Sequence, residues 1–309
     1  MHVTRSRRTT VVLAVVRVAR RLFRGRSVQQ NRMTTWLYRR VMRASSSSTG
    51  LTEINFRGAS FLLPATDVTI VPSLMLGDYE TTALQMFMLL VGDLESRAAV
   101  LDVGANVGVY SVLAARSKLG KGTVYAFEPV SANIALLEGN LARNGITSAT
   151  IVPKAVGASP GSLRIYLSRE DAGTHSAGGQ GNDFQDVAMI TLDDFARRRN
   201  IIVGAIKIDV EGYDGFVLEG AKALIRAQEP MLLVEYTPAA LEQCGYAVDR
   251  FCQTLFSLPG VWYWVDERHA CLTPLREPRD LYGIQWNRAS SSNILVTKPS
   301  ALLLPFLSG

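Results

Sequence analysis

Cysteine is scarce in this sequence of 309 residues. Cys244, Cys252 and Cys271 are the only three, and no two of them form a CxxC pair. An odd number cannot pair completely, so the sequence argues against a secreted fold held together by a disulfide framework. We expect three reduced residues that act as small apolar packing groups, in a cytoplasmic protein.

Acidic residues and lysine are absent from the first 50 residues, which instead carry twelve arginines. The remainder holds 21 of the 33 basic residues and all 27 acidic ones, so the net charge of +6 reflects a basic arm on a mildly acidic body. An acidic body argues against a nucleic-acid-binding face on the folded domain. The arm favours contact with something anionic, such as a membrane surface.

A long hydrophobic run is also missing, since no stretch reaches the roughly 18 apolar residues of a membrane-spanning helix. The apolar stretch 9–16 follows Arg7 and Arg8 and is interrupted by Arg17. No small-residue cleavage site follows, which disfavours an export signal. We expect residues 1–43 to contact the inner face of an anionic membrane peripherally, or to form a disordered basic tail. A Ser-rich linker then runs to residue 50.

The body of the sequence alternates short apolar runs with helix-length segments. The runs of strand length are Ala98–Val103, Thr123–Glu128, Ala149–Val156, Ala205–Val210 and Met231–Tyr236. The helix-length segments between them are Val107–Lys118, Ser131–Asn144 and Tyr213–Ala227. Near-continuous apolar strands separated by helices predict a parallel sheet covered on both faces, which is a doubly wound α/β fold of Rossmann type.

Several segments fall outside this alternation. Strand-like patches at 54–56 and 60–63 and a helical stretch at 79–92 come first, so we expect an N-terminal extension, residues 51–97, that packs on a core domain of residues 98–309. Another strand-like run at 162–168 precedes a long loop at 169–186, and Thr191 is placed to cap a helix. Two strand-like runs at 261–266 and 293–298, with only irregular sequence between them, should pair antiparallel because no crossover helix joins them.

The strongest signal for chemistry is the run from Val100 to Gly108. An apolar strand ends in Asp102, and Gly104 and Gly108 turn the chain into the next helix. Glycines let a backbone approach a ligand closely, and a helix start offers free N–H groups. The spacing differs from the Gly-x-Gly-x-x-Gly pattern of dinucleotide binders, and the Asp102 and Asn106 side chains suit an amino-acid moiety. The alternative is a purely structural turn.

A second signal is Glu128, at the end of the next strand and directly before Pro129. It lies twenty residues beyond Gly108, where an acidic residue can accept hydrogen bonds from both hydroxyls of a ribose. Together, the glycine turn and Glu128 are much more specific for a nucleoside-containing cofactor than either is alone.

The run from Tyr79 to Tyr246 resembles the FkbM-type family of S-adenosylmethionine-dependent methyltransferases. The matching segments, in order, are Gly77–Glu80, Leu101–Gly108, Ala126–Pro129, Asn140–Gly145, Ala155–Gly157, Thr191–Asp194, Ile206–Gly212 and Leu232–Glu235. The resemblance implies a class I methyltransferase sheet of seven strands whose last strand is antiparallel. It also implies O-methylation of a hydroxyl on a sugar, glycolipid or secondary metabolite.

The resemblance assigns roles to individual residues as well. Asp102, Gly104, Asn106 and Gly108 would line the methionine part of S-adenosylmethionine, and Glu128 would bind its ribose. Ala155 and Val156 would lie near the adenine. The acceptor would be a small molecule, a glycan or a glycolipid, and no nucleic acid is expected.

A third signal is the pair Asp209 and Glu211, two residues apart at a predicted strand end, where both side chains can face one side. Ligands of open α/β sheets bind at the carboxyl ends of strands, so this pair should border the transfer site. Either carboxylate could take the proton of an acceptor hydroxyl. Two alternatives are that the pair caps a helix starting at Tyr213, or that it binds a metal. We expect no metal, because no third ligand has suitable spacing.

His175 is one of three histidines and stands in the long predicted loop. Histidine is a natural base for a hydroxyl, and the loop could fold over the active site. The alternative is an exposed loop residue without a role.

Two other functions share some of these features. A nicotinamide-dependent oxidoreductase would share the sheet and the ribose carboxylate, but the missing third glycine and the Phe-Glu-Pro sequence argue against it. A non-catalytic, membrane-associated adaptor would explain the basic arm, but the intact cofactor motifs argue against that.

Overall fold

The computed structural model describes residues 40, 50–117, 122–168, 175–283 and 292–307. The predicted basic arm and linker therefore lie outside the described residues, apart from Arg40 and Gly50. The chain divides into two compact units, one of residues 1–79 with 168–173 and one of residues 80–167 with 174–309. An extension of residues 51–97 that packs on a core of residues 98–309 stays a prediction.

The first unit contains a hairpin and a short helix. β1 (Leu51–Phe56) and β2 (Ala59–Pro64) pair antiparallel, at the two patches predicted as strands. The turn residues Arg57 and Gly58 both have positive φ, 48° and 77°, which suits the twist of a two-residue hairpin turn. α3 (Ile70–Leu76) packs against β1. Oδ1 of Asp67 accepts the N–H groups of residues 69–71 and so satisfies the start of this helix.

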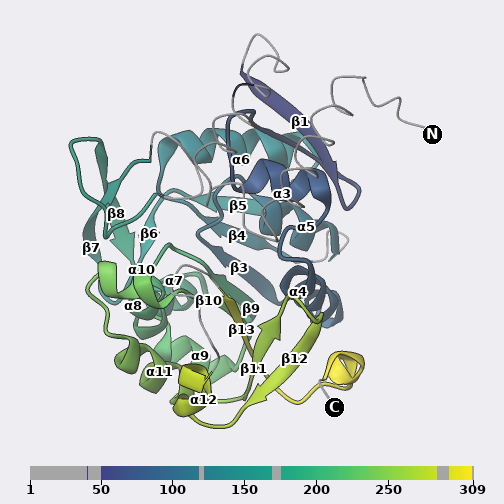
Figure 1. The fold of residues 1–309 in the computed structure, drawn as a ribbon, viewed down its shortest axis with the longest axis vertical. Coiled ribbons are helices and arrows are strands. Elements are labelled where there is room, and N and C mark those ends of the chain that lie inside the picture. The colour runs from purple at the N-terminus through teal and green to yellow at the C-terminus, as the bar shows by residue number, and fades with distance from the viewer. Residues whose placement is uncertain (1–39, 41–49, 118–121, 169–174, 284–291, 308–309) are drawn as a thin grey trace. The chain divides into compact units, whose positions relative to one another are not determined.

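The second unit carries the predicted alternation (Figure 1). It begins with α4 (Thr81–Asp93), β3 (Ala99–Val103), α5 (Val109–Ser117), β4 (Val124–Phe127), α6 (Ser131–Arg143), β5 (Ala149–Val152), β6 (Ala155–Val156), β7 (Gly161–Tyr166), β8 (Phe184–Ile190), α7 (Leu192–Arg199) and β9 (Val203–Ile208). It continues with α8 (Asp214–Glu219), α9 (Lys222–Gln228), β10 (Met231–Tyr236), α10 (Pro238–Gln243), α11 (Val248–Phe256), β11 (Val261–Asp266), β12 (Cys271–Leu275), α12 (Pro278–Gly283), β13 (Ser292–Thr297) and the 3-10 helix η3 (Ala301–Phe306).

The main sheet has eight strands in the order β12-β11-β13-β10-β9-β3-β4-β5. β5, β4, β3, β9 and β10 are parallel, while β13 is antiparallel to both β10 and β11. The predicted doubly wound sheet with an antiparallel last strand is therefore confirmed, and β12 adds an eighth strand at the edge. The chain builds outward from β3 in one direction and from β9 in the other, so the topological switch lies between these two strands.

Several details differ from the sequence prediction: β8 begins inside the predicted loop 169–186, and α10 and α11 were not predicted. The expected strand 149–156 breaks at Pro153, because proline offers no N–H to a strand ladder; its second half, β6, pairs with β8 in a separate three-stranded sheet. The expected helix 213–227 breaks at Gly220, where a Cβ would lie 2.0 Å from the carbonyl oxygen of Gly157. The segment between the two last strands contains β12 and α12 and is therefore not irregular.

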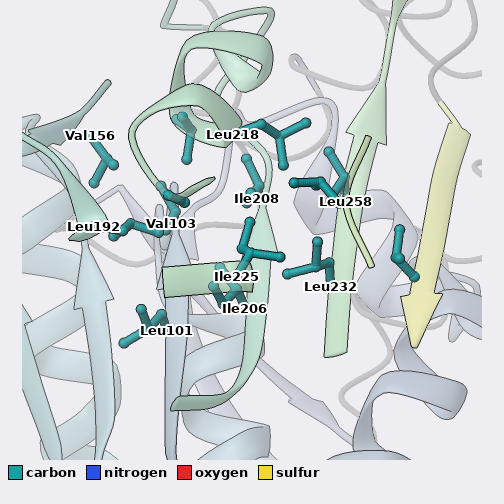
Figure 2. Packing of buried hydrophobic residues seen from close by; sticks show 14 of the residues in the cluster. Leu101, Val103, Val156, Leu192, Ile206, Ile208, Leu218, Ile225, Leu232 and Leu258 are labelled. Atoms are coloured by element: carbon teal, nitrogen blue, oxygen red, sulfur yellow. The ribbon is translucent and has the colours of Figure 1, made fainter. Parts of the chain in front are cut away.

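The two faces of the main sheet differ in character. Figure 2 shows the apolar face, where side chains of β3, β9 and β10 pack against those of α7, α8 and α9; the strand residues are Leu101, Val103, Ile206, Ile208 and Leu232. Each buried Leu or Ile contributes roughly 1.5–3 kcal/mol to folding. Successive side chains of a strand point to opposite faces, so Asp102, Lys207 and Glu235 lie on the other face. α4 packs on β10 and α5 packs on β3 there.

Candidate active site at the switch between β3 and β9

The predicted glycine turn follows β3 directly. Gly104 and Gly108 have φ of 79° and 90°, and Asn106 between them has φ of 49°. A Cβ on Gly104 would lie 1.8 Å from the carbonyl oxygen of Asp209, and one on Gly108 would lie 2.4 Å from Cδ1 of Leu137. Only glycine permits both the backbone angles and the close packing at these positions. The structural reading of the turn and the ligand-binding reading are therefore compatible.

Asp102 is buried beside this turn, with 1% of its surface exposed. Its Oδ2 accepts a hydrogen bond from the Ser111 hydroxyl at 2.6 Å, whereas Oδ1 has no partner among the described residues. Burial raises the pKa of Asp102, and the charge of Lys207 acts in the opposite direction. An unsatisfied buried oxygen is costly, so this atom is suited to accept a hydrogen bond from a ligand.

Glu128 stands directly after β4 and is also buried, with 4% of its surface exposed. Oε2 accepts the N–H of Asn106 at 2.8 Å, and Oε1 accepts the N–H of Val130 at 2.9 Å and Nδ2 of Asn133 at 3.4 Å. Burial raises the pKa of Glu128 to about 7 although these three bonds favour the ionised form. The carboxyl group thus ties the end of β4 to the glycine turn, and its contact with ribose stays a prediction.

Ala155 and Val156 form β6, where they pair with Met189 and Ile190 of β8. Both side chains are buried, with 6% and 3% of their surface exposed, and both pack into apolar clusters. Their predicted position near the adenine is not tested by this arrangement and stays a prediction.

Asp209 is the first residue after β9, and its Oδ2 accepts a hydrogen bond from Nζ of Lys207 at 2.9 Å. Glu211 has φ of 54°, so the strand alternation from which the pair was predicted to share a side ends before Glu211. The charges of Asp209 and Glu211 nevertheless both act on Glu235, since together with burial they raise the pKa of Glu235. That the pair borders the transfer site stays a prediction.

The carboxylate of Asp214 holds the turn that leads into α8, and α8 has no side-chain cap at Tyr213. The two oxygens of Asp214 accept the N–H groups of Val210 at 3.2 Å and Gly212 at 3.0 Å. α8 begins at Asp214, one residue after the start that the capping alternative assumed. The pKa of Asp214 rises to about 7 because it is buried and because Asp209 is nearby.

The segment that carries His175 lies beside Glu211. The Ser176 hydroxyl donates to the carbonyl oxygen of Glu211 at 3.0 Å, and the Cys244 thiol approaches the same oxygen at 3.5 Å. His175 itself is half-buried. The described end of the predicted loop therefore lies against the backbone of Glu211, while the role of the imidazole stays a prediction.

Sequence reasoning missed Lys207, which lies opposite Asp102 in the parallel register of β9 and β3. Its ammonium is buried, with 3% of the residue exposed, and lies 4.7 Å from the ring centre of Tyr110. Burial lowers the pKa of Lys207, but the carboxylates of Asp209, Asp102 and Glu80 more than offset this and leave it above the ordinary value. A lysine inside an otherwise apolar strand run was the signal that could have revealed it.

Glu80 and Glu235 were also missed as site residues, although both stand in the matched segments. Burial raises the pKa of Glu80 to about 7, since Glu80 lies deep among protein atoms even though part of its surface remains exposed. The pKa of Glu235 lies well above its ordinary value because of burial and the charges of Asp209 and Glu211. Among the described residues, no group of three or more His, Cys, Asp or Glu side chains could hold a metal ion.

A profile described as the methyltransferase FkbM domain matches residues 102–261, from Asp102 at the glycine turn to the start of β11. The match covers more than half of the chain. The chain belongs to the FkbM methyltransferase family. This membership confirms the predicted family and favours a methyltransferase over the nicotinamide-dependent oxidoreductase.

The cofactor of the FkbM family is S-adenosylmethionine, and the residues of the site fit it. The turn at Gly104 and Gly108 leaves no room for side chains beside the backbone, and Oδ1 of Asp102 is a buried acceptor without a partner in the described chain. Asp102 and the turn would hold the methionine part, and Glu128 at the end of β4 would hold the ribose. Carboxylates around such a site suit a cofactor that carries a positive sulfur and an ammonium group.

The solved structures to which this chain is similar include other methyltransferases. The FkbM methyltransferase of Methylobacillus flagellatus is 16% identical over 73% of this chain, with a TM-score of 0.42, and this chain spans 54% of its length. A SAM-dependent methyltransferase of Agrobacterium tumefaciens is 12% identical over 83% of this chain and 72% of its own, with a TM-score of 0.46. An rRNA methylase of Streptococcus thermophilus is 13% identical over 70% and 95%, with a TM-score of 0.39.

At these identities the likenesses carry no information about the acceptor. A comparison with curated proteins found no match. Within the described part of the FkbM protein, no helix has both the length and the apolar character needed to cross a bilayer.

Proposed function

We propose that this FkbM protein transfers a methyl group from S-adenosylmethionine to a hydroxyl group of a sugar, a glycolipid or a secondary metabolite. The observation that carries the proposal is the contact between Gly104 and Asp209 across the β3–β9 switch. Because of this contact, the glycine turn lies directly beside the segment that carries Asp209 and Glu211, at the edge of the sheet where ligands of such folds bind.

The chemistry asks little of the protein beyond alignment and a proton acceptor. S-adenosylmethionine, when bound, supplies a methyl group on a positively charged sulfur. Holding an acceptor hydroxyl in line with that group can account for much of the rate acceleration. The hydroxyl proton would go to the carboxylate of Asp209 or Glu211, or to the imidazole of His175.

Asp209 and Glu211 differ in how they are held. One oxygen of Asp209 is bound by Lys207, which fixes its position. The backbone of Glu211 is held by Ser176 and Cys244 through its carbonyl oxygen. The fixed carboxylate of Asp209 at the strand end supports its use in positioning the acceptor. His175 stands in the segment that contacts Glu211 and is the other candidate proton acceptor.

We also propose that the basic arm holds the protein at a membrane surface. Twelve arginines without an acidic residue would hold the protein at an anionic membrane, where a glycolipid acceptor is presented. A soluble sugar or metabolite would need no such arm, so the arm favours a membrane-borne acceptor.

Two experiments test the proposal. Isothermal titration calorimetry of the full chain with S-adenosylhomocysteine should show binding, and NADH should give no thermal shift. Mass spectrometry of glycolipids, polysaccharides and small metabolites from cells with and without the gene should then reveal one species that lacks a methyl group on oxygen. A missing methyl on nitrogen or carbon instead would overturn the hydroxyl assignment, and a protein that binds neither ligand would favour the adaptor.

A further inference from the structure

Glu80 occupies the first position before α4 with a backbone that few residues adopt. Its φ is 38°, in the left-handed region, although it is not a glycine. Strained residues of this kind are retained where the surrounding structure holds the side chain in a required place. An acidic residue at this position would be expected to cap the helix, since carboxylates are favoured at the start of a helix.

The carboxylate of Glu80 does not cap α4. The first N–H groups of that helix are instead bound by Glu267, from the turn between β11 and β12. Its Oε2 accepts the N–H of Thr82 at 2.8 Å, and its Oε1 accepts the N–H of Ala83 at 2.9 Å. Since a residue 185 positions away does the capping, the side chain of Glu80 is left for another contact.

Two consecutive residues of α5 hold Glu80 and Asp102 in the same manner. The Tyr110 hydroxyl donates to Oε2 of Glu80 at 2.5 Å, and the Ser111 hydroxyl donates to Oδ2 of Asp102 at 2.6 Å. No hydrogen bond to Oε1 of Glu80 or to Oδ1 of Asp102 occurs among the described residues, and Oδ1 of Asp102 is fully buried. Each carboxylate thus keeps one oxygen for a further donor.

Lys207, the buried lysine beside these carboxylates in the described part of the chain, is already engaged. Lys207 acts electrostatically on both Glu80 and Asp102, but its ammonium is hydrogen-bonded to Asp209 and lies over the ring of Tyr110. The carboxylates of Glu80, Asp102 and Asp209 therefore share the ammonium group of Lys207. Oε1 of Glu80 and Oδ1 of Asp102 can each accept a further hydrogen bond, and the excess negative charge favours a donor that is positively charged. A primary ammonium group, with three N–H donors and one charge, satisfies both requirements.

We propose that Glu80, together with Asp102, binds the α-ammonium group of the methionine part of the cofactor. The assignment rests on the proposed function, since it requires that S-adenosylmethionine binds at the glycine turn. It adds a residue that lies 22 positions before Asp102 and outside the matched domain of residues 102–261.

The test compares two ligands that differ in the amino-acid end. S-adenosylhomocysteine carries the ammonium group, whereas methylthioadenosine shares its adenosine and thioether but lacks the amino-acid end. Calorimetry on Glu80→Gln should show S-adenosylhomocysteine bound about 10- to 100-fold more weakly than by the wild type, because a charge-assisted hydrogen bond is lost. The affinity for methylthioadenosine should stay unchanged.

Glu267→Gln is the matched control, because it weakens the capping of α4 without touching the proposed ligand. It should lower the melting temperature and leave the ratio of the two affinities as in the wild type. If Glu80→Gln is too unstable to purify, Tyr110→Phe releases Oε2 of Glu80 and should weaken the binding of S-adenosylhomocysteine alone.

The possible outcomes separate this inference from the proposed function. Unchanged affinity for S-adenosylhomocysteine in the Glu80 variant, or an equal loss for both ligands, overturns the role of Glu80 while the methyltransferase assignment stands. A wild-type protein that binds neither ligand overturns both. A loss confined to the ligand with the ammonium group supports the inference.

Discussion

The α-carbon of Gly104 lies against the carbonyl oxygen of Asp209, so closely that a Cβ on Gly104 would be 1.8 Å from that oxygen. This contact joins the first residues after β3 and after β9, across the point where the strand order reverses. The glycine turn and the segment that carries Asp209 and Glu211 are therefore packed against each other, so a change in one should displace the other.

Gly104→Ala should destabilise the protein and abolish binding of S-adenosylhomocysteine. The left-handed backbone costs about 1–2 kcal/mol for a residue with a Cβ, and the overlap with Asp209 adds about 1–3 kcal/mol. Gly92→Ala is the control, because Gly92 lies in α4 with nothing within 4 Å of a built Cβ. That variant should gain about 0.5–1 kcal/mol. Urea unfolding and calorimetry measure both effects, and normal cofactor binding by Gly104→Ala would contradict the role of the turn.

Lys207→Met should cost about 3–5 kcal/mol of stability, because it leaves Asp102, Asp209 and Glu80 without their buried counter-charge. Lys298→Met removes a comparable lysine, since Nζ of Lys298 lies 3.1 Å from Glu229, but that pair is exposed and should contribute less than about 1 kcal/mol. Urea unfolding of both variants gives the comparison. Equal losses would mean that the charge of Lys207 is not important for the fold.

Asp209→Asn, Glu211→Gln and His175→Ala test the base. The variant that removes the base should keep its affinity for S-adenosylhomocysteine and lose about 100- to 10,000-fold in single-turnover rate, since a positioned base contributes that much. Asp214→Asn is the structural control, because Asp214 accepts the N–H groups of Val210 and Gly212 in the turn before α8. This variant should lose about 1 kcal/mol of stability, the typical contribution of such a hydrogen bond. Near-normal rates in all three variants would mean that alignment alone drives the transfer.

Glu128→Gln should reduce the loss of stability of the cofactor-free protein between pH 5 and pH 8. The pKa of Glu128 is about 7 in the folded chain against an ordinary value of 4.5. A raised pKa gives stability that is fully present below pH 4.5 and is lost as the pH rises through 7. Glutamine cannot ionise, so the variant should lose less on going from pH 5 to pH 8. Melting temperatures across this window measure the difference, and an equal or larger fall in the variant would refute the assignment.

Deletion of residues 1–48 should abolish sedimentation with anionic vesicles and leave the melting temperature nearly unchanged. The arm carries twelve arginines, and each basic residue near an anionic surface contributes about 1 kcal/mol. A chain of full length with glutamine at Arg20, Arg21, Arg24 and Arg26 separates charge from length. Binding of the full chain should weaken at high salt. Equal sedimentation of the truncated and full-length proteins would exclude a membrane role for the arm.

The elements that the sequence predicted well are those with a local pattern. The alternation of apolar runs and helices, the turn at Gly104 and the acidic end of β4 are written in neighbouring residues, because strand burial and glycine turns need particular residue types at short spacing. The antiparallel pairing of β11 and β13 followed from the missing crossover helix. The break at Pro153 also had a local signal, since proline interrupts a strand ladder, yet the prediction ran one strand through it.

The partners within the site were decided by the tertiary structure. Nothing near Lys207 in the sequence shows that the charge of Glu80 acts on its ammonium, because that interaction depends on α4 packing over the sheet. The capping of α4 by Glu267, 185 residues away, likewise has no local signal. The raised pKa values of Glu80 and Glu128 arise from burial, which is a property of the assembled core. Sequence alone thus determined which residues end the strands, while packing decided which of their charges meet, because strand register and helix docking bring together residues far apart in the chain.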